Sequence, residues 1–181
     1  MVLPPLPHKL LTLAFVLRNA PLAANALALT PAKRQVLLGM KKRGFGMGKW
    51  NGFGGKVDPT DVSVVAAAAR EIEEEANVHV KENDLKERGI LMFTFEGGKE
   101  ILEVHVFLTT NFDGEPSESE EMRPQWYDEE ELPFDTMWED DRIWLPHVLN
   151  GKAVYGHFHF SSDENSLVHH ELDIMEPENV C

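Results

Sequence analysis

The chain has 181 residues and a formal net charge of −14, from 31 acidic and 17 basic side chains. A hydrophobic fraction of 43% is typical of a folded globular domain and excludes a fibrous or fully disordered chain, and this length fits one domain rather than two. The acidic excess disfavours general binding to nucleic acid, and no run of about 18 apolar residues predicts a membrane span.

Basic and acidic residues are distributed unevenly along the chain. The first acidic residue is Asp58, so residues 1–57 carry nine Lys and Arg side chains and no Asp or Glu, whereas the remainder carries eight against 31. The first part includes the basic residues Lys41, Lys42, Arg43 and Lys49. Two interpretations stay open: a solvated loop of lysines, or a cluster that helps to hold a polyanion together with divalent cations.

The first predicted element is a largely buried strand over Leu10–Arg18. Its side chains alternate between two faces. Leu11, Leu13, Phe15 and Leu17 would lie on one face, and Thr12, Ala14 and Val16 on the other. This alternation favours a strand over a cleaved leader, although residues 1–28 are apolar and contain no acid. The only cysteine is Cys181, so an internal disulfide is excluded and a reducing compartment is expected. We expect the cytoplasm, with mitochondria and nucleus left open.

Further strands follow from the same kind of alternation. They are predicted at Gln35–Met40, Arg88–Phe95, Leu102–Thr109, Gln125–Tyr127 and Val154–Phe160. The segment Asn19–Lys33, rich in Ala and Pro, indicates an extended hairpin loop. We therefore predict one domain over residues 9–174 with an inserted loop at 19–33. A short extension over residues 1–8 precedes it, and a disordered acidic tail over residues 175–181 follows.

A glycine-rich segment precedes the first predicted helix. Six glycines lie within residues 44–55, which excludes a helix interior and lets backbone amides approach a ligand closely. The segment Asp58–Asp61 predicts the start of a helix that continues to Ala76, and Asn77 fits a left-handed cap. A second helix is predicted at Arg142–Leu149.

The end of the first helix carries a group of carboxylates on one face. Glu71, Glu74 and Glu75 stand at positions i, i+3 and i+4, so they are neighbours on the helix surface. Such like charges repel one another unless a cation lies between them, and carboxylate oxygens suit Mg²⁺ or Mn²⁺. A solvated acidic face is the alternative on spacing alone. The preceding glycine-rich loop favours a site for a metal-bound phosphate chain.

These residues resemble the Nudix box, whose pattern is G-x5-E-x7-R-E-U-x-E-E-x-G-U with U a bulky aliphatic residue. The matching residues are Gly55 and then Arg70-Glu71-Ile72-Glu73-Glu74-Glu75-Ala76-Asn77-Val78. The chain departs from the pattern at three points. The interval from Gly55 to Arg70 is one residue longer, the first Glu falls on Asp61 if the extra residue follows it, and the final Gly is Asn77.

The resemblance extends over about residues 9–174, and is strongest to the MutT-homologue branch of the family. It includes residues 36–46, 50–57, 104–107, 118–126 and 137–141. The implied fold is the Nudix α/β/α sandwich, an α/β fold with a mixed β-sheet. The implied reaction is magnesium-dependent hydrolysis of oxidised purine nucleoside triphosphates, such as 8-oxo-dGTP and 2-hydroxy-dATP, to the monophosphate and pyrophosphate. Such an enzyme removes damaged precursors from the nucleotide pool.

The resemblance also implies which residues form the site. The metal would be held by Gly54, Gly55, Glu71, Glu74, Glu75 and Glu121, with Arg70 orienting a helix carboxylate. The base pocket would be built from Asn51, Phe93, Trp138, Asp140 and Asp141, with Thr12, Lys41 and Phe45 along its edge. Without the resemblance, Trp138 would be assigned to the core and Asp140 and Asp141 to the start of a helix.

Two other functions remain open on the sequence. One is a Nudix hydrolase for a different nucleotide, such as a dinucleoside polyphosphate or a capped RNA end. The other is a catalytically inactive module that binds nucleotides. The base-pocket residues argue against the first, and the intact carboxylate set argues against the second. We expect a small-molecule nucleoside triphosphate as the ligand of a monomer, with no stable nucleic-acid or membrane partner.

Histidines provide one further pattern. His157 and His159 would share one face of a strand, and His169 and His170 lie near the C-terminus. A transition-metal site is conceivable there, but neither pair has an obvious third ligand, so the sequence alone favours ordinary exposed strand residues. His105 is expected to be a packed strand residue.

Overall fold

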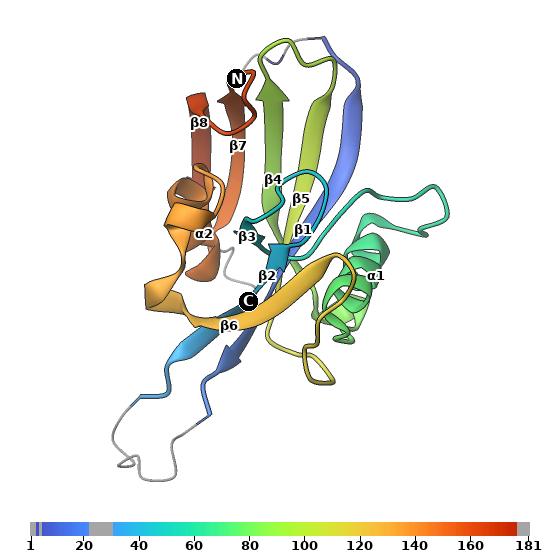
Figure 1. Cartoon of the computed structure of the whole chain (residues 1–181), viewed down its shortest axis with the longest axis vertical. Coiled ribbons are helices and arrows are strands. Elements are labelled where there is room, and N and C mark those ends of the chain that lie inside the picture. The colour runs from blue at the N-terminus through green and yellow to red at the C-terminus, as the bar shows by residue number, and fades with distance from the viewer. Residues whose placement is uncertain (1–2, 4, 22–30, 177–181) are drawn as a thin grey trace.

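The computed structural model describes residue 3, residues 5–21 and residues 31–176, which form one mixed sheet with helices on both faces (Figure 1). The strands are β1 (His8–Asn19), β2 (Arg34–Lys41), β3 (Trp50–Asn51), β4 (Lys86–Phe95), β5 (Ile101–Thr109), β6 (Met122–Asp128), β7 (Ala153–Phe160) and β8 (Leu167–Met175). The α-helices are α1 (Val64–Ala76) and α2 (Asp141–Leu149). Single 3-10 turns lie at Glu82–Asp84, Glu129–Glu131 and Phe134–Thr136. No helix within the described ranges is both long and apolar enough to cross a membrane.

The sheet has eight strands in the order β3-β2-β1-β5-β4-β7-β8, with β6 paired to β2 as a branch. Two of its pairings are parallel, β1 with β5 and β4 with β7, and the others are antiparallel. Strand β1 occupies the centre because it pairs with β5 along His8–Val16 and with β2 along Val16–Asn19. The mixed sheet expected from the sequence is confirmed.

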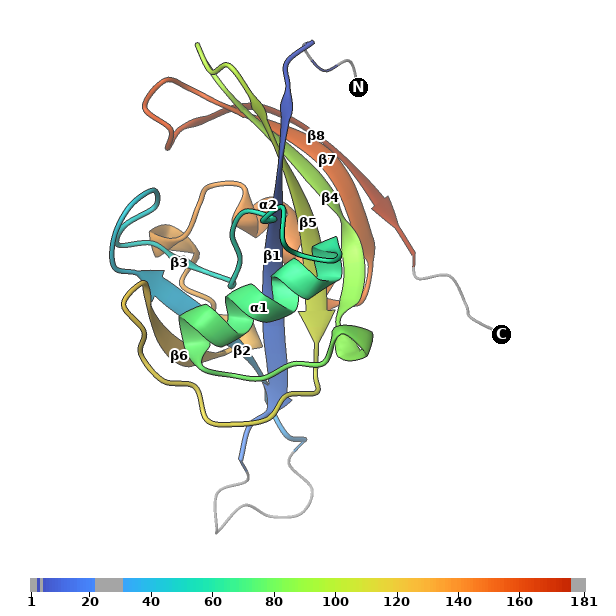
Figure 2. The ribbon, with the colours of Figure 1, turned by 90° about the vertical axis from the view of Figure 1, so that its right-hand side faces the viewer.

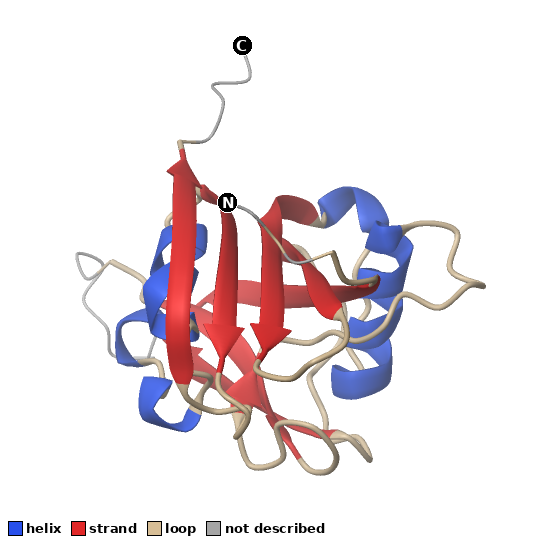
Figure 3. Cartoon of the chain, turned by 90° about the horizontal axis from the view of Figure 1, so that it is seen from above, coloured by secondary structure: helices blue, strands red, loops and turns tan. Residues whose placement is uncertain are grey.

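Alternation along β1 divides the interior into two cores. Phe15 and Leu17 pack on one face with Trp144 of α2, whereas Ala14 and Val16 pack on the other face with α1. Figure 2 shows α1 lying across one side of β1 with α2 behind the other side, and Figure 3 shows helices flanking the strands on both sides. Because both faces of β1 are buried over residues 14–17, all four of these residues are apolar. The α/β/α layering is therefore confirmed.

All six predicted strands and the second predicted helix are confirmed, with ends that differ by at most a few residues. Two strands were not predicted. β3 has only two residues, and β8 is an exposed edge strand whose polar residues hide the alternation that a buried face produces. The expected disordered tail is wrong at its first residue, because Met175 ends β8, and residues 177–181 lie outside the described part. The expected loop at 19–33 is likewise described only at its two ends.

The start of α1 differs from the prediction. The helix begins at Val64, and its N-cap is Ser63, whose hydroxyl accepts a hydrogen bond from the Ala66 N–H at 3.1 Å. Asp58 and Asp61 instead form a turn before the helix, because the Asp58 side chain accepts the Thr60 N–H at 2.9 Å. The segment predicted to start the helix is thus a capped turn that positions Asp61.

Candidate active site

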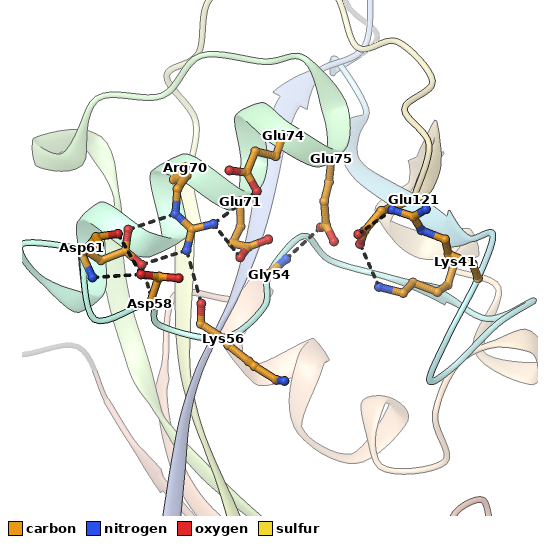
Figure 4. Close-up of polar contacts among 12 residues, drawn as sticks. Lys41, Gly54, Lys56, Asp58, Asp61, Arg70, Glu71, Glu74, Glu75 and Glu121 are labelled. Carbon is orange, nitrogen blue, oxygen red and sulfur yellow. Dashed lines mark hydrogen bonds and ion pairs between the residues drawn. The ribbon is translucent and has the colours of Figure 1, made fainter.

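Arg70 is the centre of the polar network on α1 (Figure 4). Its Nε lies 2.9 Å from Oδ1 of Asp61 and its Nη2 lies 2.8 Å from Oδ2, which makes a bidentate pair. Nη1 donates to Glu71 Oε1 at 2.8 Å and to Glu74 Oε2 at 3.2 Å. The paired hydrogen bond expected for a helix carboxylate therefore goes to Asp61, and Glu71 receives a single one.

Two glycines bring the preceding strand segment against this helix. A Cβ at Gly54 would lie 1.9 Å from the Thr12 carbonyl oxygen, so the segment approaches β1 more closely than any side chain permits. A Cβ at Gly55 would lie 2.7 Å from Glu71 Oε1. The Gly54 N–H donates to Glu75 Oε2 at 3.0 Å, as Figure 4 shows. These glycines place their backbone directly beside the carboxylates of α1.

Burial makes ionised carboxylates costly at this point. Glu75 is 2% exposed, and burial is the main reason that its pKa rises to about 8. Burial also raises the pKa of Glu71, although the hydrogen bond from Arg70 opposes the rise. Without a cation, the negative charge on Glu71 and Glu75 is therefore held at a cost.

Glu121 approaches the α1 carboxylates from the loop before β6. Its carboxylate forms ion pairs with Lys41 at 3.3 Å and with Arg43 at 3.2 Å, and these hydrogen bonds lower its pKa, Arg43 being the larger cause. Lys42 instead pairs with Glu118 at 2.8 Å. Three members of the basic cluster are therefore ion-paired, and the fourth, Lys49, lies over the Trp138 ring.

The donor set fits a hard divalent cation. Glu71, Glu74, Glu75 and Glu121 supply carboxylate oxygens, the ligand type that Mg²⁺ and Mn²⁺ prefer, and a cation would offset the burial that raises the pKa of Glu75. In the part of the chain that the structure describes, no group of three His, Cys, Asp or Glu side chains is already arranged to hold a metal ion. Binding would require Glu71, Glu74 and Glu121 to turn from their present ion pairs.

A cavity of about 860 Å³ adjoins the glycine segment. All the residues expected in the base pocket line it: Thr12, Lys41, Phe45, Asn51, Phe93, Trp138, Asp140 and Asp141. Gly54, Gly55 and Glu121 also line this cavity. Glu71 and Glu75 contact the glycine segment, so the cavity and the carboxylate cluster share Gly54 and Gly55 as a common wall.

Asp140 and Asp141 lie at the inner end of the cavity and are 2% and 1% exposed. Oδ2 of Asp140 accepts the Trp144 indole N–H at 2.7 Å, and Oδ2 of Asp141 accepts the Trp138 backbone N–H at 3.1 Å. Burial raises the pKa of both groups, and the neighbouring Asp140 charge raises that of Asp141 further. The pair therefore retains a proton at a higher pH than exposed aspartates do. Asp140 occupies the N-cap position of α2, but its side chain makes no capping hydrogen bond.

Aromatic side chains also line the cavity. Trp138 stacks on Phe45 with ring centroids 4.9 Å apart, and the ammonium of Lys49 lies 4.9 Å from the Trp138 ring. Phe45 is 54% exposed, although it is a large apolar side chain. A planar ligand could stack on Trp138 or Phe45 only where the ring is not already covered by these neighbours.

Three residues make contacts in the site that the sequence did not predict. Asp61 holds Arg70, Trp144 holds Asp140, and Lys49 covers Trp138. The spacing of Trp144, four residues after Asp140 on a predicted helix, is a signal that could have indicated it. For Asp61 and Lys49 the contacts depend on how loops fold back, which spacing alone does not show.

Comparisons with known proteins agree with the family and the fold. The NUDIX domain family model matches residues 20–148. The oxidized purine nucleoside triphosphate hydrolase of Danio rerio is 49% identical over 142 residues, which is 78% of this chain and 88% of that protein. The protein of the same name from Mus musculus is 43% identical over 146 residues, which is 81% of this chain and 91% of that protein. The crystal structure of the mutator MutT protein from Bacillus halodurans has a TM-score of 0.72 at 26% identity, covering 91% of this chain and 97% of that one.

Proposed function

The chain belongs to the Nudix hydrolase family, and from that premise we propose that it hydrolyses oxidised purine nucleoside triphosphates to the monophosphate and pyrophosphate. We take 8-oxo-dGTP and 2-hydroxy-dATP as the substrates to test. Nudix hydrolases typically use a divalent metal, and we propose Mg²⁺ for this chain, with Mn²⁺ as a substitute. The two relatives named for this activity align along most of their length.

The cavity is the observation that carries the proposal. It combines the aromatic rings of Trp138 and Phe45 with a buried pair of aspartates, which suits a flat base with several donor and acceptor atoms on its edge. Gly54 and Gly55 line the cavity and also contact the carboxylates of α1. A nucleotide bound by its base in the cavity would extend its phosphate chain along this glycine segment.

The chain's own residues divide the catalytic work as follows. Glu71, Glu74, Glu75 and Glu121 would hold the divalent cation. When bound, that cation supplies charge neutralisation for the phosphate chain and makes water more acidic. Arg70 holds Glu71 in place, and Asp61 holds Arg70.

We assign the proton acceptor for the attacking water to Glu75. Glu71 and Glu74 both accept hydrogen bonds from the cationic Arg70, and Glu121 pairs with Lys41 and Arg43, whereas Glu75 Oε2 accepts a neutral peptide N–H. A carboxylate held by a neutral donor keeps more of its basicity than one held by a cation. Oε1 of Glu75 is the atom proposed to take the proton.

Steady-state kinetics on 8-oxo-dGTP, 2-hydroxy-dATP and dGTP with Mg²⁺ test the proposal, with pyrophosphate and orthophosphate measured separately. We expect a higher kcat/KM for at least one oxidised substrate than for dGTP, with pyrophosphate as the product. Turnover of a dinucleoside polyphosphate or capped RNA in preference to all three would indicate a different Nudix substrate. Tight nucleotide binding without any phosphate release would indicate an inactive binding module.

We also propose that the protein acts as a monomer. We further propose that it acts in a reducing compartment such as the cytoplasm, since Cys181 is the only cysteine in the sequence. Mass measurement by light scattering after size exclusion tests the first point. Fluorescent tagging at either end of the chain, with fractionation as a control, tests the second.

A further inference from the structure

Three histidines gather on one face of the β7–β8 hairpin. Phe158 and Phe160 of β7 point into the core shared with α2, so His157 and His159 point to the opposite face. The strand register places His169 of β8 directly opposite His159, and Glu171 directly opposite His157. The third ligand that the sequence did not show is therefore supplied by the neighbouring strand.

Thr94 of β4 joins the first two histidines from the other side. Its Oγ1 lies 2.6 Å from His157 Nε2 and 2.8 Å from His159 Nδ1, and the residue is 4% exposed. A hydroxyl oxygen has two lone pairs, so it can accept an N–H from both rings at once. In that arrangement the remaining nitrogens, Nδ1 of His157 and Nε2 of His159, carry lone pairs that are available to a ligand.

A carboxylate beside the three rings favours a cation. Glu171 lies 3.8 Å from His169. Imidazole nitrogens beside a carboxylate are a ligand set for Zn²⁺ and similar ions, not for Mg²⁺.

We propose that His157, His159 and His169 bind a divalent transition-metal ion, Zn²⁺ above all, at a site separate from the carboxylates of α1. Thr94 is the residue that orients two of the ligands through their other ring nitrogens, as hydrogen-bonded neighbours of zinc ligands commonly do. Glu171 or water completes the coordination.

The site requires a small movement of side chains. The rings of His157 and His159 have centroids 6.4 Å apart. Two imidazoles on one tetrahedral zinc have centroids roughly 5 Å apart, given Zn–N distances of about 2.0–2.1 Å. This separation agrees with the absence of a preformed metal cluster among the described residues. The side chain of His169 is 63% exposed, so it can turn without disturbing the core.

A metal ion here would fasten the edge of the sheet. β8 is the terminal strand and pairs with β7 as its neighbour in the sheet. Ligands on both strands would cross-link them near the turn end of the hairpin. Zinc should therefore raise the melting temperature and slow amide exchange in β8, effects that do not depend on turnover.

The test is a Co²⁺ and Zn²⁺ titration of protein stripped with EDTA, in excess Mg²⁺ so that carboxylate sites are occupied. Visible absorption of Co²⁺ distinguishes four-coordinate imidazole ligation from octahedral oxygen ligation. We expect one equivalent to bind at micromolar concentration, with Zn²⁺ displacing Co²⁺. His159→Ala and His169→Ala should weaken binding by tenfold or more, and Thr94→Val by about 10- to 100-fold.

His170→Gln is the matched control, since His170 lies on the same strand but stacks on Phe158 at 5.6 Å, on the opposite face. It should bind Co²⁺ as the unchanged protein does. His169→Ala is expected to fold normally, because this exposed side chain contributes little to packing. Circular dichroism in EDTA checks the fold of every variant. Equal affinity in His169→Ala, His159→Ala and the unchanged protein would overturn the proposal. So would the absence of any four-coordinate Co²⁺ spectrum.

Discussion

Arg70 lays one edge of its guanidinium along the carboxylate of Asp61, with hydrogen bonds of 2.9 and 2.8 Å from Nε and Nη2. The remaining nitrogen, Nη1, donates to Glu71 at 2.8 Å. Asp61 lies in the turn before α1. It therefore determines the position of Arg70, and Arg70 holds Glu71, a candidate metal ligand. Asp61 is therefore a positioning residue, and it stands where the family pattern has glutamate if the extra residue of the box follows it.

Asp61→Asn should lower kcat/KM by about tenfold on every substrate, because the amide nitrogen faces an Arg70 donor and the bidentate pair is lost. The hydrogen bond from Arg70 lowers the pKa of Asp61, so its stabilising effect is present above the ordinary pKa and is lost as pH falls through the lowered value. Glu73→Gln, on the same helix but 63% exposed, is the control. Asp61 is expected to act on the metal site through Arg70. A raised KM with an unchanged kcat in Asp61→Asn would contradict that role.

Glu75→Gln should abolish turnover with the fold intact. The amide keeps the shape of the side chain and can still accept the Gly54 N–H, but it removes the charge and the proposed proton acceptor. A loss on the order of 10²-fold or more is expected for an essential catalytic group. Turnover numbers for Glu75→Gln and Glu73→Gln, measured side by side, check this. Near-normal turnover would remove Glu75 from the site.

The same variant should be more stable than the unchanged protein when divalent cations are removed. Burial raises the pKa of Glu75 from an ordinary 4.5 to about 8. The folded state thus holds this proton more tightly than the unfolded chain, and stability falls as pH rises from the ordinary value to the raised one. At pH 8 in EDTA, Glu75→Gln should gain on the order of 4 kcal/mol. Urea unfolding at pH 5 and pH 8 measures it, and a gain that is the same at both values would exclude Glu75 ionisation as the cause.

The residues that the sequence predicted best are those whose roles depend on local spacing. The carboxylates at i, i+3 and i+4 lie together on α1, and alternation in β1 placed both of its faces in the interior. The base-pocket residues came from family resemblance, and the structure gathers all of them around one cavity.

The parts that spacing did not predict depend on contacts between distant segments. The helix starts after the N-cap Ser63 and not within Asp58–Asp61. The carboxylate of Asp61 binds Arg70, nine residues later in the sequence, and does not cap the helix. β8 is polar on an exposed edge, so only its pairing with β7 identifies it as a strand. His169 became a candidate ligand through the same pairing, which no periodicity in the sequence indicates.

Asn77→Gly should change stability by less than about 1 kcal/mol. Asn77 ends α1 in the left-handed region, with φ 57° and ψ 31°, where glycine has no Cβ penalty. The gain is reduced because the Asn77 side chain donates to the Ser117 carbonyl at 3.2 Å, a hydrogen bond that glycine loses. Asn77→Ala is the comparison and should be clearly destabilising. Thermal melts of the three proteins decide it, and a large loss in Asn77→Gly would show that the Ser117 contact outweighs the backbone conformation.

Asp140→Asn and Asp141→Asn should change the ratio of activity on oxidised and normal purines, unlike Glu75→Gln, which should lower all activities together. Both aspartates are buried, and each already directs one oxygen at a tryptophan, Trp144 Nε1 for Asp140 and the Trp138 N–H for Asp141. An asparagine must keep its oxygen on the tryptophan N–H, so its NH₂ group can only donate to the base. The aspartate pair, in contrast, can present either a protonated or an ionised group to the base. An oxidised purine differs from the normal one in which edge atoms donate and accept, so fixing one state alters discrimination. The measurement is kcat/KM for each variant on 8-oxo-dGTP, 2-hydroxy-dATP and dGTP. Equal losses on all three would mean that the aspartates serve α2 and its packing, and oxidised-base recognition would then have to lie elsewhere in the cavity.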